Sequence, residues 1–113
     1  MNDRELLELA ARAIGIPLEW SKESDCGPRT TGWKTWNPLT DDGDAFRLAM
    51  KLDLKMHHGY TRNHVGPAAF AGDGEQFCIE CHEDYTDGKF GAMRRTITRY
   101  AAEIGKRTEA LLT

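Results

Sequence analysis

Apolar residues recur three or four positions apart in three segments of the chain, which predicts three amphipathic helices. The first is predicted over residues 3–14, capped by Asn2 or Asp3. The second begins at 40 or 41 and continues to 52, and the third runs from about 90 towards 112. Their apolar stripes are Leu6, Leu9, Ala10, Ala13 and Ile14; Ala45, Leu48, Ala49 and Leu52; and Met93, Ile97, Tyr100, Ala101, Ile104 and Leu111.

Short strand-like runs lie between these helices. Segments 18–20, 32–36 and 55–58 are tolerant of a strand conformation. Segments 68–71 and 76–83 flank Gly-Asp-Gly-Glu, a turn sequence typical of β-hairpins. The element order is therefore α-β-β-α-β-β-β-α. Because three apolar helix stripes need covering, we expect an α+β fold in which three helices pack on a small antiparallel sheet, in an α/β/α sandwich-like arrangement.

Composition indicates one globular domain over residues 1–113. Hydrophobic residues make up 40% of the chain and charged residues 29%, and no repeat or linker divides it. The net charge of −3 argues against a dedicated nucleic-acid binder. No apolar run approaches the ~18 residues that cross a bilayer, and no signal-peptide core is present. We therefore expect a cytoplasmic protein with no membrane contact, whose three cysteines are thiols.

Three blocks of the sequence are similar to short accessory proteins of tailed, mostly temperate bacteriophages. Segment 36–52, WNPLTDDGDAFRLAMKL, resembles the signature WNPLTDDGDALRLAVKL of those proteins. Segment 93–105 is similar to their ending RRAIVRAAAEIG, and 3–16 to their opening RELLELAAKAAGI. The blocks cover a little under half of the chain. The resemblance implies a phage or prophage origin and the fold called a phage ABA sandwich, but it implies no activity and no catalytic residues.

The segment Cys78-Ile79-Glu80-Cys81-His82 carries the C-x-x-C-H pattern of covalent haem attachment. Haem attachment requires export to an oxidising compartment, and the chain shows no export signal. The same Cys78, Cys81 and His82 are also candidate zinc ligands, with a fourth from Cys26, His57, His58 or His64.

Strand geometry argues against the zinc site, because Cys78 and Cys81 on one strand would point to opposite faces. The plain strand alternative places Phe77, Ile79 and Cys81 inside the fold, and Cys78, Glu80 and His82 outside. We therefore expect no cofactor, and zinc is kept as the alternative.

Other polar motifs lack the pattern that catalysis or calcium binding requires. Asp41, Asp42 and Asp44 offer oxygen ligands, but Leu52 stands where an EF-hand needs a closing Glu. The adjacent His57 and His58 would face opposite sides of a strand, and with His64 they are interpreted as surface residues. No nucleophile or carboxylate stands at a diagnostic spacing from them. The chain is therefore not expected to be an enzyme.

Five residues are candidates for contact with a partner: Trp33, Trp36, Arg94, Arg95 and Arg99. The two tryptophans would face opposite sides of a strand, which would place one indole in the core and the other at a partner surface. The three arginines form a basic face on the last helix.

The leading hypothesis is a non-enzymatic protein-interaction module that modulates a host or phage protein in the host cytoplasm. Counter-defence, such as an anti-CRISPR action, is one concrete form. The alternative is a zinc-stabilised module that contacts nucleic acid through the basic face of the C-terminal helix. The partner is not identified by the sequence, and a homodimer is left open.

Overall fold

The computed structural model describes residues 2–20, 29–30, 35–60 and 67–112. Its elements are α1 (Asp3–Ala13), β1 (Leu18–Glu19), β2 (Arg29–Thr30), α2 (Asp42–Lys51), β3 (Lys55–Tyr60), β4 (Pro67–Gly72), β5 (Phe77–Cys81), the short 3-10 helix η1 (His82–Asp84) and α3 (Lys89–Leu112). The predicted α+β class and the predicted order of helices and strands are confirmed. No helix in the described ranges combines the length and apolarity that crossing a membrane requires.

The two shorter helices begin at polar caps. Asn2 Oδ1 accepts the backbone N–H of Glu5 at 2.9 Å, in front of α1. Asp41 Oδ2 accepts the backbone N–H of Asp44 at 2.8 Å, in front of α2. Each bond satisfies an amide that has no partner within its helix. The aspartates after Leu39 are thereby explained as a helix start.

Strands β3, β4 and β5 form an antiparallel sheet in that order. Residues opposite one another share a face, so His58, Ala69 and Glu80 form one row across the sheet. The next position along each strand turns to the other face, which places His57, Phe70 and Ile79 in a second row. Strands β1 and β2 pair separately as a short antiparallel ladder.

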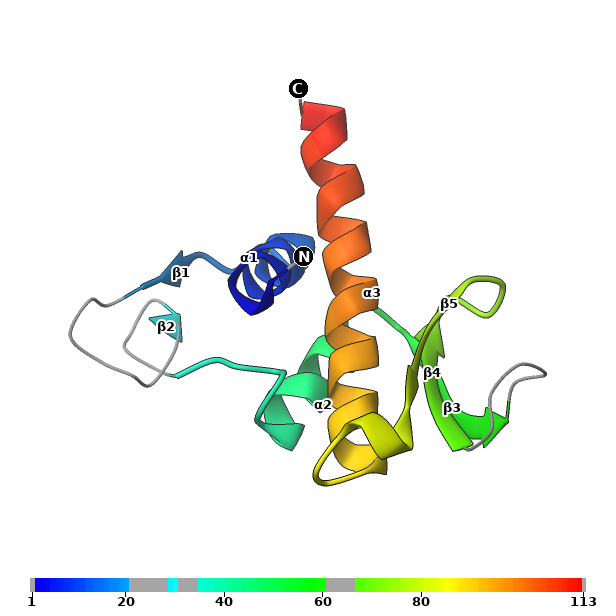
Figure 1. Ribbon diagram of the computed structural model, residues 1–113. Helices are drawn as coiled ribbons and strands as arrows, with labels where there is room; N and C mark the ends of the chain where they lie inside the picture. The colour runs from blue at the N-terminus through cyan, green and yellow to red at the C-terminus, as the bar shows by residue number, and fades with distance from the viewer. Residues whose placement is uncertain (1, 21–28, 31–34, 61–66, 113) are drawn as a thin grey trace.

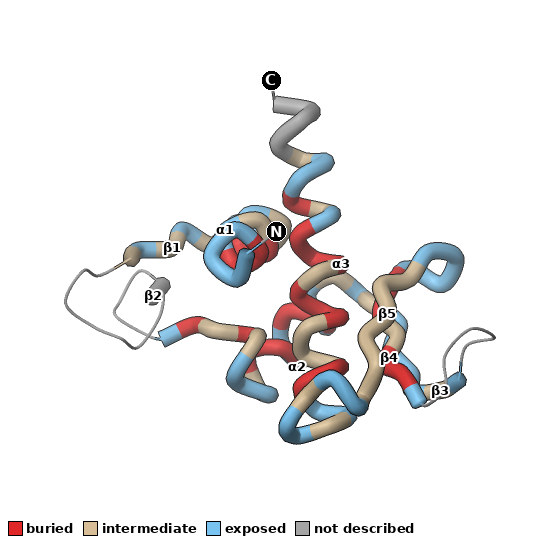
Figure 2. The backbone as a smooth tube through the Cα atoms, viewed as in Figure 1, coloured by how far each residue is buried: buried red, intermediate tan, exposed pale blue. Residues whose placement is uncertain are grey.

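Helix α3 is the middle layer of the molecule. It contacts α1 on one side and strands β4 and β5 on the other, with α2 packed beside it (Figure 1). The buried positions of the described chain concentrate along α3 and along the sides of α1 and α2 that face it (Figure 2). Three of those positions are polar or charged: Asp44 of α2, and Thr96 and Thr98 of α3. The two threonine hydroxyls donate to the carbonyls of Ala92 and Arg94 within the same helix. The hydroxyls therefore cost little on burial.

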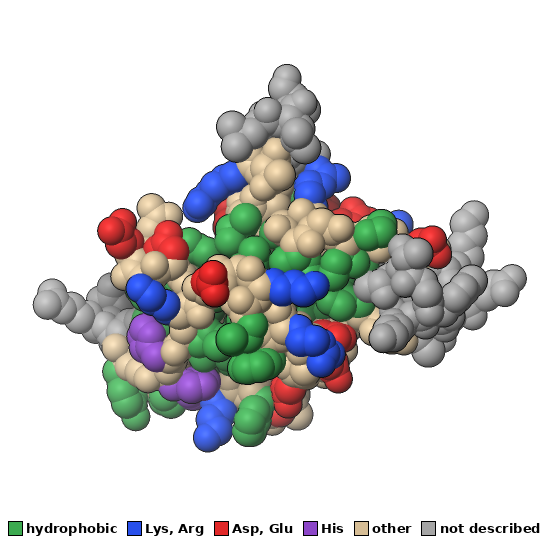
Figure 3. All heavy atoms as spheres, turned by 180° about the vertical axis from the view of Figure 1, so that it is seen from behind, with side chains coloured by type: hydrophobic (Ala, Val, Ile, Leu, Met, Phe, Trp, Pro, Cys, Tyr) green, Lys and Arg blue, Asp and Glu red, His purple; other side chains and the backbone are tan. Residues whose placement is uncertain are grey.

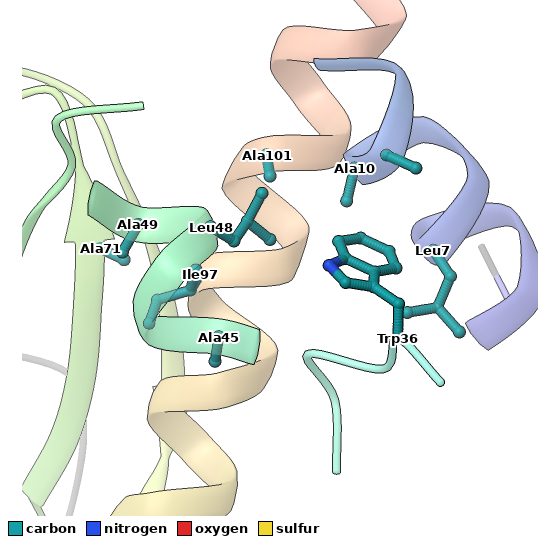
Figure 4. Packing of buried hydrophobic residues seen from close by; sticks show 10 residues of the cluster. Leu7, Ala10, Trp36, Ala45, Leu48, Ala49, Ala71, Ile97 and Ala101 are labelled. Atoms are coloured by element: carbon teal, nitrogen blue, oxygen red, sulfur yellow. The ribbon is translucent and has the colours of Figure 1, made fainter. Parts of the chain in front are cut away.

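One hydrophobic cluster joins all three helices and the sheet. Its buried members are Leu7, Ala10, Ala11, Trp36, Ala45, Leu48, Ala49, Ala71, Ile97 and Ala101. Figure 4 shows the indole of Trp36 between the side chains of α1 and Leu48 of α2. Most of the other members are alanines, so backbones approach closely and the large indole fills the remaining volume.

Several strand boundaries differ from the prediction, and three of the differences are the largest. Trp36 belongs to no strand, and most of the predicted 32–36 strand lies outside the described residues. Strand β3 continues to Tyr60, two residues beyond the predicted end. Strand β5 stops at Cys81, because the next three residues turn into η1.

Helices α1 and α3 approach closely at Gly105. A Cβ atom at this position would overlap the backbone carbonyl of Leu9. Gly105→Ala should therefore destabilise the fold by about 1–3 kcal/mol, although alanine favours a helix by about 1 kcal/mol over glycine. Urea unfolding measures the difference. Gly43→Ala in α2 is the matched control, since its added methyl meets only the ends of the Asp41 and Arg47 side chains. Equal stabilities for the two variants would contradict this packing.

The Asp73 side chain stabilises the turn between β4 and β5 through hydrogen bonds. Its Oδ1 accepts the backbone N–H groups of Gln76 and Glu75, both at 2.8 Å, and Tyr100 of α3 also hydrogen-bonds to this side chain. The bonds from Gln76 and Glu75 are the main reason that the pKa of Asp73 falls to about 2.

This shift predicts a stability change in acid. Between pH 3.8 and about 2 the unfolded chain binds the Asp73 proton and the folded chain does not. The stabilisation is complete above this window and is lost as the pH falls through it. Asp73→Asn should remove this part of the pH dependence in urea unfolding, whereas Glu75→Gln in the same turn should retain it. A carboxyl carbon of Asp73 that titrates near 3.8 by NMR would refute the assignment.

Candidate functional site

An apolar groove lies between α2, β3 and the start of α3. Its volume is about 530 Å³. The walls carry Phe46 from α2, Met56 from β3, and Phe90 and Met93 from α3, while the buried Ala45 and Ile97 also line it. Figure 3 shows the molecule from behind, where hydrophobic side chains and histidines lie next to one another between cationic groups. This groove is the candidate functional site.

The groove exposes large hydrophobic side chains to solvent. Phe46 is 58% exposed, Phe90 55% and Met56 36%. Met50, 57% exposed, follows Phe46 by about one helical turn on α2. Large apolar side chains exposed together mark sites of contact with a ligand or a partner more often than isolated ones do. The groove therefore has the character of a docking surface.

The polar groups of the groove are few and are partly neutralised. Asp42 and Arg94 both line it and form an ion pair at 2.7 Å. Lys89 lies beside the Phe90 ring, with its Nζ 5.6 Å from the ring centroid. His58 also lines the groove, and burial, followed by nearby His82, Lys89 and His57, lowers its pKa below the usual 6.5. The histidine is therefore mainly neutral at pH 7.

Two histidines meet at this edge of the sheet. His58 Nδ1 and His82 Nε2 lie 2.7 Å apart, with the ring centroids 4.7 Å apart at 67°. His57 points to the other face, where it stacks on Phe70 at a centroid distance of 4.5 Å. The predicted divergence of His57 and His58 is therefore what the structure shows. His64 lies outside the described residues.

The C-x-x-C-H segment is a strand followed by a turn of 3-10 helix. Cys78 and Cys81 stand three positions apart on β5 and so occupy opposite faces of the sheet. In the described part of the chain, no three His, Cys, Asp or Glu side chains come together as a metal-binding group. Cys78, Cys81 and His82 thus do not form one ligand set there, and Cys26 lies outside the described ranges.

The two faces of β5 have the reverse of the predicted orientation. Cys78 and Glu80 face the helices, where they line a polar cleft of about 360 Å³ with Arg99. Phe77 lies on the opposite face, against the rings of His57 and Phe70. Glu80 faces inward because Arg99 donates to one of its carboxylate oxygens and the Tyr85 hydroxyl donates to the other. Ionic and hydrogen-bonding partners outweigh the hydrophobicity on which the prediction relied.

Burial also determines the protonation state of the Cys78 thiol. Its surroundings raise the pKa of the thiol above the usual value of 9, mainly through desolvation. Nearby Arg99 opposes that shift without cancelling it. Cys78 is therefore protonated at neutral pH, and the cleft holds a thiol of low nucleophilicity.

Arg94 connects three parts of the fold. Its side chain is only 14% exposed. It donates to the carbonyl of Leu39 at 2.9 Å, to Asp42 at 2.7 Å and to Asp87 at 2.5 Å. The guanidinium therefore links α3 to the start of α2 and to the turn before α3.

The other two predicted arginines are also paired within the chain. Arg95 donates to Asp3 at 2.7 Å, and Arg99 pairs with Glu80. Their side chains are 28% and 41% exposed. The predicted basic face is thus largely taken up by intramolecular ion pairs, and Arg94 is the one of the three that lines the groove.

Trp36 is a core residue, with 6% of its surface exposed. It packs with Leu7, Ala10 and Leu48, and so it offers no surface to a partner in this conformation. Trp33, the second indole of the sequence hypothesis, lies outside the described residues.

The groove residues Phe46, Met56 and Phe90 were not among the candidates drawn from the sequence. A partial signal was present, because Phe46 and Met50 widen the apolar stripe of α2 beyond the width that one packed face needs. These side chains of α2 come close to β3 because α2 and the sheet both pack against α3. The periodicity of a single helix gives no information about that packing.

Comparison with known proteins shows no relative: no protein-family model, curated protein or solved structure matches this chain.

Removing the Arg94 guanidinium should destabilise the folded protein. Arg94→Ala should lower the free energy of unfolding by about 1–3 kcal/mol, a range set below that for fully buried pairs because the Asp42 and Asp87 carboxylates are partly in water. Arg4→Ala is the control, since Arg4 is 63% exposed and pairs with a partly exposed Glu8. It should change stability by about 1 kcal/mol or less. A similar loss for both variants in urea unfolding would count against the structural role of Arg94.

Proposed function

We propose that this chain is a non-enzymatic protein-interaction module that binds a host protein and modulates its activity through the α2–β3–α3 groove. The supporting observation is the clustering of exposed apolar side chains. Five large hydrophobic residues of the described chain are exposed, and Phe46, Met56 and Phe90 among them line this one groove. Full burial of an exposed Phe side chain contributes about 1.5–3 kcal/mol, and Phe46 and Phe90 retain roughly half of that exposed surface for a partner to cover.

The shape of the groove suits a protein side chain. Ala45 and Ile97 among its lining residues are buried, so an apolar side chain entering the groove would meet apolar atoms on several sides. The acidic and basic pair of Asp42 and Arg94 is already mutually satisfied. Specific recognition of a small polar molecule usually needs several polar groups that converge on it. An apolar anchor from a protein partner fits this lining better.

The target class rests on the resemblance to phage accessory proteins. Such proteins act in a bacterial cell, which makes a host protein the expected partner. Antagonism of a host defence system, such as an anti-CRISPR action, is one form that this modulation would take. The groove is bordered by residues inside the similar blocks, such as Phe46 and Met93, and by others outside them, such as Met56 and Phe90.

The test compares groove variants with an exposed control. Phe46→Glu and Phe90→Glu place a carboxylate in the groove and should weaken partner binding by about tenfold or more, at unchanged stability, because both positions are solvent-exposed. Tyr60→Glu is the control, since Tyr60 is 76% exposed on β3 and does not line the groove. Tagged wild type and variants are used to capture proteins from bacterial lysate, and the affinity of the captured protein is then measured with purified components.

The proposal holds if one stoichiometric partner is captured by wild type and Tyr60→Glu and is lost with both groove variants. Capture that is equal for all four proteins would remove the groove from the interface. If wild type captures no stoichiometric partner, the protein-interaction proposal itself fails. Light scattering of the purified wild type and Phe46→Glu shows whether the groove instead holds a second copy of the chain.

A further inference from the structure

Two ring nitrogens converge at the edge of the sheet. The register of the sheet aligns His58 on β3 with Ala69 and Glu80, and His82 follows Glu80 by two positions. This brings His58 Nδ1 and His82 Nε2 within 2.7 Å of each other. In the neutral pair, one nitrogen donates a proton to the other. When that proton moves to the outer nitrogen of its ring, both facing nitrogens have a free lone pair and can bind a cation.

The separation matches one coordination geometry better than another. A metal–imidazole bond is about 2.0–2.1 Å, so two adjacent ligands of a square-planar or octahedral ion lie about 2.9 Å apart. Two ligands of a tetrahedral ion lie about 3.4 Å apart by the same geometry. The observed 2.7 Å is closer to the first separation, and metal binding also requires both rings to turn so that their lone pairs, which lie along the hydrogen bond, converge on the ion. Ni²⁺ and Cu²⁺ adopt that arrangement and favour imidazole ligands.

We propose that His58 and His82 form a two-histidine binding site for a divalent transition-metal ion of the Ni²⁺ or Cu²⁺ type. The remaining coordination positions are filled by water, because the described residues supply no third protein ligand. This site differs from the C-x-x-C-H zinc hypothesis, since it takes only His82 from that motif. It does not rest on the protein-interaction proposal, although His58 lines the α2–β3–α3 groove as well.

The charges around the pair set limits on its affinity. Lys89 and His57 act on His58 and disfavour a nearby cation. Glu83 and Asp84 directly follow His82 in η1 and act electrostatically on neighbouring Cys81. With two protein ligands and this mixed field, the site is expected to bind metal reversibly and to release it to a chelator.

The experiment is a Ni²⁺ titration of the full-length, ¹⁵N-labelled protein, followed by NMR. Octahedral Ni²⁺ is paramagnetic, so it broadens the resonances of nearby residues. The broadened resonances therefore show where the ion binds. The expected result is saturable broadening centred on His58 and His82, with one ion per chain, reversed by EDTA. His58→Gln and His82→Gln should each weaken the binding by about tenfold or more, because each removes one of two ligands.

The matched control is His57→Gln, which removes the neighbouring imidazole on the opposite face of the sheet. It should retain the affinity and the pattern of broadening. Amide spectra of the three metal-free variants establish that each is folded, and His58→Ala serves as a second substitution at that position. The proposal is overturned if wild type shows no saturable broadening. It is equally overturned if the broadening persists in both His58→Gln and His82→Gln, or if it centres on the cysteines or on the N-terminus.

Discussion

Packing on two sides of one helix is the constraint on which this fold depends. Helix α3 lies between α1 and the sheet, so two separate stripes of its surface must be buried at once. Small side chains meet this demand: Ala92, Ala101 and Ala102 are fully buried, and Gly105 lets the backbone of α1 come close. Close helix approach brings many weak atomic contacts per residue, which compensates for the small area of each alanine. Trp36 and α2 then fill the space that remains beside this layer.

The three sequence blocks at 3–16, 36–52 and 93–105 meet in this core. The block at 3–16 contributes Leu7 and Ala10, the block at 36–52 contributes Trp36 and Leu48, and the last contributes Ile97 and Ala101. Arg94 adds a polar link between the last two blocks. The blocks therefore describe how the fold is built, and an activity has to be sought in surface residues that this architecture places together.

Local elements could be predicted from the sequence because their signals are local. The caps at Asn2 and Asp41, the turn at Asp73 and the alternation of β5 all depend on residues a few positions apart. The direction of each β5 face could not be predicted in this way. It depends on the pairing of Glu80 with Arg99, which lies nineteen positions further along the chain.

The candidate site was harder to predict than the fold for the same reason. The groove combines α2, β3 and α3, and the histidine pair joins positions 24 residues apart. From the sequence, His58 and His82 were candidates within a different ligand set, because the C-x-x-C-H motif groups residues that are adjacent in the chain and not residues that are adjacent in space. The role of Trp36 was ambiguous from sequence, since an indole suits both a core and an interface.

The contact between α1 and α3 has a consequence for how the protein folds during its synthesis on the ribosome. These helices stand at opposite ends of the described chain, and Asp3 pairs with Arg95 across that distance. The apolar face of α1 is made before α3 and remains uncovered until α3 has left the ribosome. At ordinary rates of synthesis that interval is on the order of ten seconds. During it, Leu6 and Leu7 are exposed to chaperones and to other nascent chains, so the core assembles only after α3 has been made.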